Sequence, residues 1–138
     1  MIAYVDSSVI LRKLLGEPGA LAAWRSIESA YASRLLPVEV ARVIDRLRLS
    51  ARIDDEAVVR LHTELRRILR SIDLVAVGES VLRRAAAPMP TVVGSLDAIH
   101  LATALEVAAH VNAPLTLATH DAQLARAARA SGLEVTGA

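Results

Sequence analysis

Residues 1–15, MIAYVDSSVILRKLL, establish the pattern that the rest of the chain follows. A short run of β-branched, aromatic and small apolar residues stops at Asp6, and two serines lead from it into a segment with helical spacing. A buried strand followed by an acid and a helix predicts the first unit of an α/β fold. The acid would stand at the carboxyl end of the strand. Ligands of parallel α/β sheets bind beyond such ends.

Short β-branched segments alternate with longer helical ones along the remaining chain. Strands are expected at 2–6, 31–35, 72–77, 114–119 and 133–136, and helices at 7–15, 20–30, 37–50, 54–70, 79–87, 96–110 and 121–130. Five short strands with helical crossovers predict an α/β sandwich in which helices flank a mostly parallel five-stranded sheet. A chain of 138 residues without internal repeats is expected to form a single domain over 1–138.

Composition excludes several classes of protein. The chain is 54% hydrophobic and 22% charged, which is too apolar for a disordered protein. No uncharged apolar run approaches the roughly 18 residues of a membrane span, and no secretory signal is recognised, so a cytoplasmic location without membrane contact is expected. The absence of cysteine excludes disulfides, thiolate metal sites and thiol nucleophiles.

The charge balance limits how the protein could bind nucleic acid. Sixteen basic and 15 acidic residues give a formal net charge of +1. Proteins that bind nucleic acid through bulk charge are strongly basic, so such a role here would depend on a local site. The apolar residues are mainly Ala, Leu and Val, with only 2% aromatics. Their abundance indicates more apolar surface than a lone monomer of this size easily buries, which favours an oligomer or a bound partner.

Four acids share one kind of position, at or near the start of a predicted helix. They are Asp6, Glu39, Asp97 and Asp121. Each alone is explained as a helix cap, because carboxylates bond the free N–H groups and complement the helix dipole. Several carboxylates at one sheet edge would instead repel one another unless protons or cations intervened. Oxygen ligands without cysteine suit Mg²⁺ or Mn²⁺, which can activate water for phosphodiester hydrolysis.

Four segments carry a family resemblance and occur in the family's order. They are YVDSSVILRKLL at 4–15, SRLLPVEVARVI at 33–44, SLDAIHLATAL at 95–105 and ATHDAQLARAARASGL at 118–133, of which the third is the most specific. Through them the chain resembles a PIN-domain ribonuclease, and more closely a VapC-type toxin of a VapBC toxin–antitoxin pair. The resemblance implies a PIN-like three-layer sandwich and a homodimeric endoribonuclease. It also implies that this enzyme cuts RNA with Mg²⁺ or Mn²⁺ and is inhibited by a cognate VapB-type antitoxin.

The resemblance also assigns roles by position. It makes the four acids the catalytic metal site, and it matches Ser7 and Thr119 to supporting hydroxyl residues. An arginine that is common before the third motif is absent, since Val93 and Gly94 stand there. From its place in the sequence near the site, Arg12 is expected to contact RNA.

The histidine of the third segment has two interpretations. His100 follows Asp97 by one helical turn, so it could contact a carboxylate or a phosphate. The chain has no H-E-x-x-H or similar ligand spacing, and a structural or solvent-facing role is therefore expected.

Other functions compete with that of a toxin nuclease. A phosphatase of the haloacid-dehalogenase type would use Asp6 as nucleophile, but position 8 is serine where many such enzymes carry a second Asp. A catalytically silent PIN-like binding module, or a PIN nuclease outside any toxin–antitoxin pair, stays open. The presence of all four acids argues against the silent module.

Overall fold

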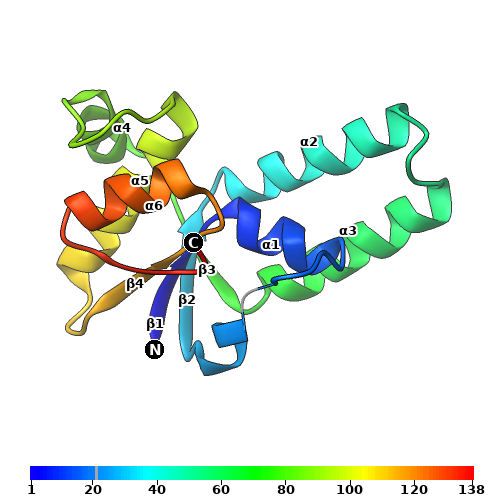
Figure 1. The fold of residues 1–138 in the computed structure, drawn as a ribbon, viewed down its shortest axis with the longest axis horizontal. Helices are drawn as coiled ribbons and strands as arrows, with labels where there is room; N and C mark the ends of the chain where they lie inside the picture. The colour runs from blue at the N-terminus through cyan, green and yellow to red at the C-terminus, as the bar shows by residue number, and fades with distance from the viewer. Residues whose placement is uncertain (21) are drawn as a thin grey trace.

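The centre of the molecule is a five-stranded sheet, shown in Figure 1 between two groups of helices. The structure is a computed structural model that describes residues 1–20 and 22–138. The strands are β1 (Ile2–Val5), β2 (Ser29–Ser33), β3 (Ile72–Val75), β4 (Leu115–Ala118) and β5 (Glu134–Thr136). They lie in the order β3-β2-β1-β4-β5, and all four pairings are parallel. The predicted α/β sandwich is therefore confirmed.

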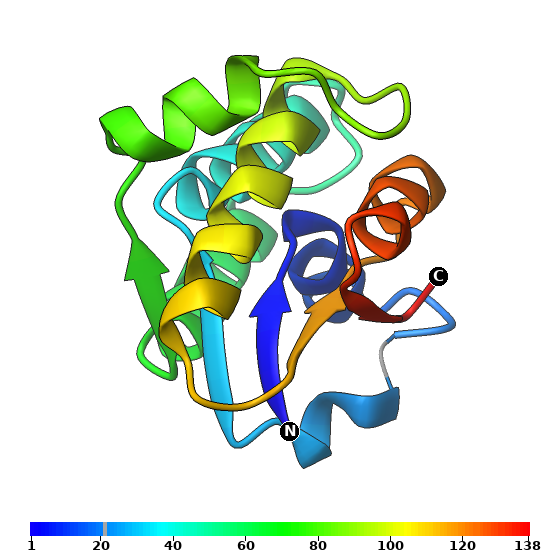
Figure 2. The same ribbon diagram turned by 90° about the vertical axis from the view of Figure 1, so that its left-hand side faces the viewer.

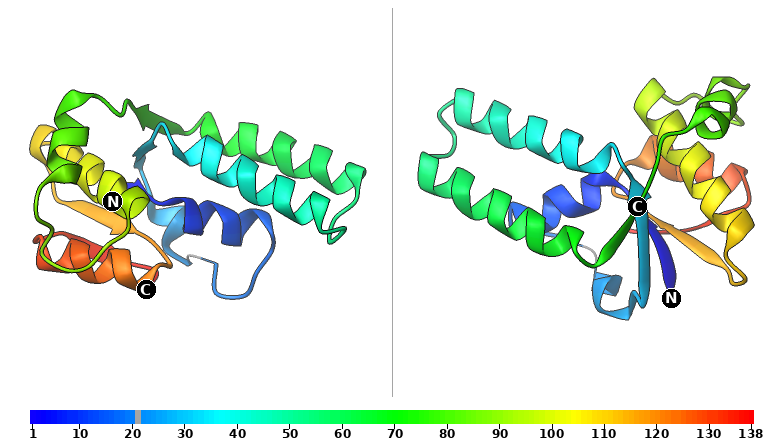
Figure 3. Two further views of the ribbon diagram at one scale, coloured as in Figure 1. Left: turned by 90° about the horizontal axis from the view of Figure 1, so that it is seen from above. Right: turned by 180° about the vertical axis from the view of Figure 1, so that it is seen from behind.

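Helices form the two outer layers. They are α1 (Ser7–Leu14), α2 (Leu36–Leu49), α3 (Asp55–Leu69), α4 (Glu79–Ala86), α5 (Ser95–His110) and α6 (Ala122–Ala130). Figures 1 and 3 show α1, α2 and α3 on one side of the sheet, with α2 and α3 running side by side beyond it. On the other side lie α5 and α6, with α4 packed on α5 (Figure 2). No helix in the described part of the chain is long and apolar enough to cross a membrane.

The alternation of side chains along β1 creates two cores, one on each face of the sheet. Ala3 and Val5 pack with the apolar residues of α1, α2 and α3, whereas Tyr4 packs with those of α5 and α6. All three are completely buried. Successive residues of a strand point to opposite faces, and a strand apolar on both faces is typical of a parallel sheet covered on both sides.

The order of the strands reverses between β1 and β4. From β1 the chain builds outward through β2 to β3, and it then returns to add β4 and β5 on the opposite side. Register pairs Ile2 with Leu115 and Val5 with Ala118, so β1 and β4 end together. Ligands of open α/β sheets bind at this switch in strand order, beyond the carboxyl ends.

The helix expected over 20–30 is wrong. The structure has only a 3₁₀-helix, η1 (Ala22–Ser26), and β2 begins at Ser29, two residues before the predicted strand. Leu21, part of the apolar spacing on which that helix was predicted, lies outside the described residues. Pairing with β1 explains the shift, since the Glu28 N–H donates to the Met1 carbonyl at 2.9 Å and Ser29 pairs with Ile2. Sheet pairing therefore overrides local helical spacing here.

Core packing can be tested with a matched pair of leucines. Leu124 on α6 is completely buried, and Leu49 at the end of α2 is 70% exposed. We expect Leu124→Ala to lower the free energy of unfolding by about 2–5 kcal/mol, because it removes buried methyl groups and leaves a cavity. Leu49→Ala should change it by less than about 0.5 kcal/mol. Urea denaturation measures both values, and equal losses would contradict the assignment of the core.

Candidate active site

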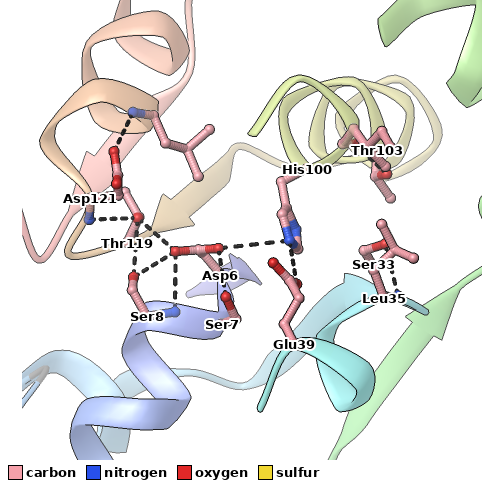
Figure 4. A network of polar contacts seen from close by, with 12 residues as sticks. Asp6, Ser7, Ser8, Ser33, Leu35, Glu39, His100, Thr103, Thr119 and Asp121 are labelled. Atoms are coloured by element: carbon pink, nitrogen blue, oxygen red, sulfur yellow. Dashed lines mark hydrogen bonds and ion pairs between the residues drawn. The ribbon is translucent and has the colours of Figure 1, made fainter. Parts of the chain in front are cut away.

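The first acid, Asp6, is buried at the end of β1, where it caps α1 (Figure 4). Its Oδ2 accepts hydrogen bonds from the Ser8 backbone N–H at 3.2 Å, from Ser8 Oγ at 2.5 Å and from Thr119 Oγ1 at 3.0 Å. The predicted capping role is therefore real. It uses one oxygen only, because the donor nearest to the other, Oδ1, among the residues that the structure describes is Ser7 Oγ at 3.5 Å.

Two hydroxyl groups join the end of β1 to the end of β4. Thr119 Oγ1 donates to Asp6 and accepts from the Asp121 N–H at 3.0 Å, while Ser8 Oγ accepts from the His120 N–H at 2.9 Å. Thr119, predicted as a supporting residue, is completely buried. The prediction passed over Ser8, which contacts both loops. The sequence signal that could have identified Ser8 is its position two residues after the acid at the N-cap of α1.

Asp121 caps α6 from the end of β4. Its Oδ1 accepts from the Gln123 and Leu124 N–H groups, both at 2.8 Å. Its Oδ2 accepts no hydrogen bond from any residue that the structure describes. Like Asp6, this acid is anchored through one oxygen.

Glu39, in the first turn of α2, is bonded to a buried histidine. Its Oε2 lies 2.7 Å from His100 Nε2, and Nδ1 of the same ring lies 2.9 Å from Tyr4 Oη. His100 is 1% exposed, and its Nε2 is also 3.9 Å from Asp6 Oδ1. Burial lowers the pKa of His100, but the hydrogen bond to Glu39 and the nearby carboxylates outweigh burial and raise that pKa. The expectation that His100 is structural or solvent-facing missed this contact with a candidate acid.

Asp97 lies in the first turn of α5 and is only partly buried. Gly94 is the N-cap of this helix, and neither oxygen of Asp97 accepts a hydrogen bond from the described residues. Burial raises the pKa of the Asp97 carboxyl, and the charges of Asp121 and Asp6 raise it further. The capping interpretation is therefore wrong for Asp97. The shift in its pKa indicates that Asp97 interacts with Asp121 and Asp6 through their charges.

The donor chemistry of this cluster fits a hard divalent cation. Among residues 1–20 and 22–138, each of the four acids keeps at least one oxygen without a short hydrogen bond, and no thiol or methionine sulfur is among the donors described above. Carboxylate oxygens are the ligands that Mg²⁺ and Mn²⁺ prefer. Within residues 1–20 and 22–138, no three acids or histidines are yet grouped closely enough to hold one ion. Binding would therefore require the free oxygens to turn toward each other.

A groove of about 340 Å³ adjoins the acids. Its walls come from α1, α2 and the start of α5, and they are lined by Ser7, Leu11, Leu35, Val38, Glu39, Arg42, Val43, Arg46 and Leu96. Arg46 makes no ion pair with the residues that the structure describes, whereas Arg42 pairs with Asp45 at 3.2 Å. Arg12 does not line the groove, and its Nε lies 3.8 Å from Glu17. The basic side chains that line this groove together with Glu39 are Arg42 and Arg46.

The chain is similar to a known protein family over most of its length. The PIN domain family profile matches residues 3–130. The chain belongs to the PIN domain family. It is 32% identical over 135 residues to a protein named Ribonuclease VapC46 from Mycobacterium tuberculosis, an alignment that covers 96% of this chain and 94% of that protein. The VapC-type resemblance read from the sequence is thereby confirmed.

Solved structures with low sequence identity share the fold. A toxin–antitoxin complex from Klebsiella pneumoniae has a chain with a TM-score of 0.69 at 17% identity, covering 97% of this chain and 95% of that one. VapBC2 from Rickettsia felis, bound to a DNA fragment of its promoter, gives a TM-score of 0.66 at 12% identity, covering 98% and 97%. The three-layer PIN-like architecture expected from the resemblance is confirmed.

The raised pKa of Asp97 predicts how stability depends on pH without metal. A carboxyl whose pKa is higher in the folded than in the unfolded state favours folding while protonated, and this contribution is lost as pH rises through the folded pKa. We therefore expect Asp97→Asn to raise Tm at pH 7 in EDTA. The difference from the parent should shrink below pH of about 4, near the pKa of an unperturbed Asp.

Calorimetric unfolding across this pH range would measure the difference. Asp73→Asn serves as the control, since Asp73 is an exposed acid on β3. A lower Tm for Asp97→Asn at pH 7 would contradict the electrostatic description of the cluster.

Proposed function

We propose that the protein is a metal-dependent endoribonuclease that acts as the toxin of a type II toxin–antitoxin pair. The observation that carries the proposal is the set of four acids near the switch in strand order, each with an oxygen that accepts no short hydrogen bond from the described part of the chain. Family membership and the relative named as a ribonuclease support the same activity. The chemistry would be hydrolysis of RNA phosphodiester bonds.

Each acid has a proposed role. Asp6, Asp97 and Asp121 would hold an Mg²⁺ or Mn²⁺ ion, directly or through water, and Glu39 would bind a second ion or orient the attacking water. When bound, the metal would activate water and stabilise charge on the leaving oxygen. The hydroxyls of Ser8 and Thr119 hold Asp6 Oδ2, so the carboxylate keeps its orientation while Oδ1 stays available.

RNA would approach through the groove beside the acids. An uncompensated acidic cluster repels phosphate, so the ion has to reduce the negative charge before RNA can bind. Four of the 15 acidic residues belong to the cluster. The rest of the molecule therefore has more basic residues, 16 in all, than acidic ones. Arg46 lines the groove, and we propose that it contacts a phosphate of the RNA. The Arg12 contact stays a prediction with no support from its position.

The apolar part of the groove suits a protein partner. Val38 is 58% exposed and Leu96 is 52% exposed, an unusual degree of exposure for large apolar residues that lie together. We propose that a cognate VapB-type antitoxin covers this groove and blocks access to the acids. Structural neighbours taken from toxin–antitoxin complexes are consistent with such a partner. We also propose a homodimer, as the abundance of apolar residues suggested.

The nuclease is tested by Asp6→Asn with purified protein and a labelled single-stranded RNA. Asparagine can still accept the Ser8 N–H bond and cap α1, so the fold should persist. We expect cleavage in Mg²⁺ or Mn²⁺ to fall about 100-fold or more, because the variant weakens ion binding. Asp73→Asn, which changes an exposed acid on β3, should cleave at the parent rate.

Two outcomes would contradict the nuclease. One is equal cleavage by Asp6→Asn and the parent, and the other is parent cleavage that persists in EDTA. Calorimetry with Mn²⁺ addresses the alternative of a silent binding module. No ion bound by a folded parent with all four acids intact would favour that alternative.

The toxin role predicts an effect on growth. Induced expression of the parent in a bacterial host should stop growth, because RNA cleavage halts protein synthesis, and expression of Asp6→Asn should not. Co-expression of the short reading frame next to the gene should restore growth if it encodes the antitoxin. Colony counts after induction measure both effects. Unimpaired growth despite soluble, RNA-cleaving protein would place the enzyme outside toxin–antitoxin systems.

A further inference from the structure

One buried group has no part in the function proposed so far. His100 is 1% exposed and stands between the phenol of Tyr4 and the carboxylate of Glu39. Tyr4, His100 and Glu39 come from β1, α5 and α2, which are separated along the chain. Figure 4 shows His100 and Glu39 turned toward each other next to Asp6, the residue that follows β1. A buried imidazole is costly unless both ring nitrogens are bonded, and here both are.

The two hydrogen bonds of the His100 ring have a defined donor and acceptor in each protonation state. Burial raises the pKa of the Tyr4 phenol, so the phenol keeps its proton. In the neutral ring that has its proton on Nε2, Tyr4 donates to Nδ1 and the Nε2–H donates to Glu39. In the charged ring, Nδ1–H donates to the Tyr4 oxygen and Nε2–H still donates to Glu39. The bond to Glu39 Oε2 at 2.7 Å therefore holds in both states of the histidine.

Glu39 depends on this bond for its orientation. Its side chain has three rotatable bonds and is 19% exposed, and among the described residues only His100 bonds its carboxylate. Asp6 is fixed by Ser8 and Thr119, and Asp121 by two backbone N–H groups. Without the histidine, Glu39 could turn toward solvent and away from Asp6, which would also reduce the repulsion between the two carboxylates.

We propose that His100 is a positioning residue that holds Glu39 through Oε2 and leaves Oε1 available to the divalent ion, with Tyr4 fixing the ring. The inference rests on the proposed function, because it assigns Glu39 to the ion. Groups that orient a metal ligand typically contribute 10–100-fold to metal affinity or activity. A histidine that served only to fill the core would have no such effect.

The test measures the dissociation constant of Mn²⁺ by calorimetry and the cleavage of single-stranded RNA by the same proteins. His100→Leu removes both hydrogen bonds, and His100→Gln keeps an N–H donor near the position of Nε2. We expect His100→Leu to weaken Mn²⁺ binding by about 10-fold or more, with kcat reduced more than KM changes. His100→Gln should recover most of the loss. His110→Leu, at the exposed end of the same helix, should behave as the parent.

A double-mutant cycle with Glu39→Gln separates positioning from core packing. If His100 acts through Glu39, then His100→Leu should weaken Mn²⁺ binding by less than about twofold in the Glu39→Gln background. Thermal unfolding monitors whether each variant is folded. Tyr4→Phe provides a milder variant, since it keeps the buried ring and removes only the O–H; we expect about a threefold loss of Mn²⁺ affinity.

The outcomes distinguish this inference from the proposed function. Unchanged Mn²⁺ affinity in folded His100→Leu or, if that variant does not fold, in Tyr4→Phe would overturn the role of His100. Equal losses in both backgrounds, or no rescue by a folded His100→Gln, would do the same. In each of these cases the proposed nuclease function still holds, provided that the parent protein binds Mn²⁺ and cleaves RNA. A parent that does neither contradicts the proposed function itself.

Discussion

The parallel pairing of β1 with β4 is the constraint on which the rest of the structure depends. Because Val5 pairs with Ala118, the residues that follow the two strands leave the sheet side by side. Asp6 therefore accepts a hydrogen bond from Thr119, which lies 113 positions later in the chain. The same pairing places β1 at the centre of the sheet, so that its side chains belong to both cores. The position of Asp6 beside Thr119 and Asp121, and the burial around Asp6, follow from this one pairing.

Bringing four carboxylates to one edge costs stability, and the structure offsets the cost in different ways. Asp6 and Asp121 each commit one oxygen to a helix cap, which satisfies N–H groups that every helix start leaves unpaired. Glu39 is paired with a buried histidine, whereas Asp97 receives no hydrogen bond from the described residues and its pKa is raised. Functional sites often destabilise a protein in this manner. A ligand that binds only the folded state then raises the free energy of unfolding and offsets the cost.

For Asp6 and Asp121, a helix-cap role does not conflict with the proposed metal site. The same carboxylate can cap a helix with one oxygen and present the other to an ion, as the bonds of Asp121 illustrate. The groove beside them adds an apolar wall and two arginines, so one surface offers features suited to both RNA and a protein partner. Competition between them for that surface would explain how an antitoxin inhibits such an enzyme.

The sequence by itself determined the alternation of strands and helices and the placing of four acids at helix starts, because periodicity and capping act over a few residues. A family pattern also singled out Thr119, which the structure buries against Asp6. The sequence failed at residues 20–30, where β2 is fixed by pairing with β1. Only the tertiary structure decided which oxygen of each acid is bonded, that Ser8 joins two loops, and that Tyr4, His100 and Glu39 form one chain of hydrogen bonds. Tyr4 and His100 are 96 positions apart, and such contacts arise from strand order and helix packing, which local patterns do not specify.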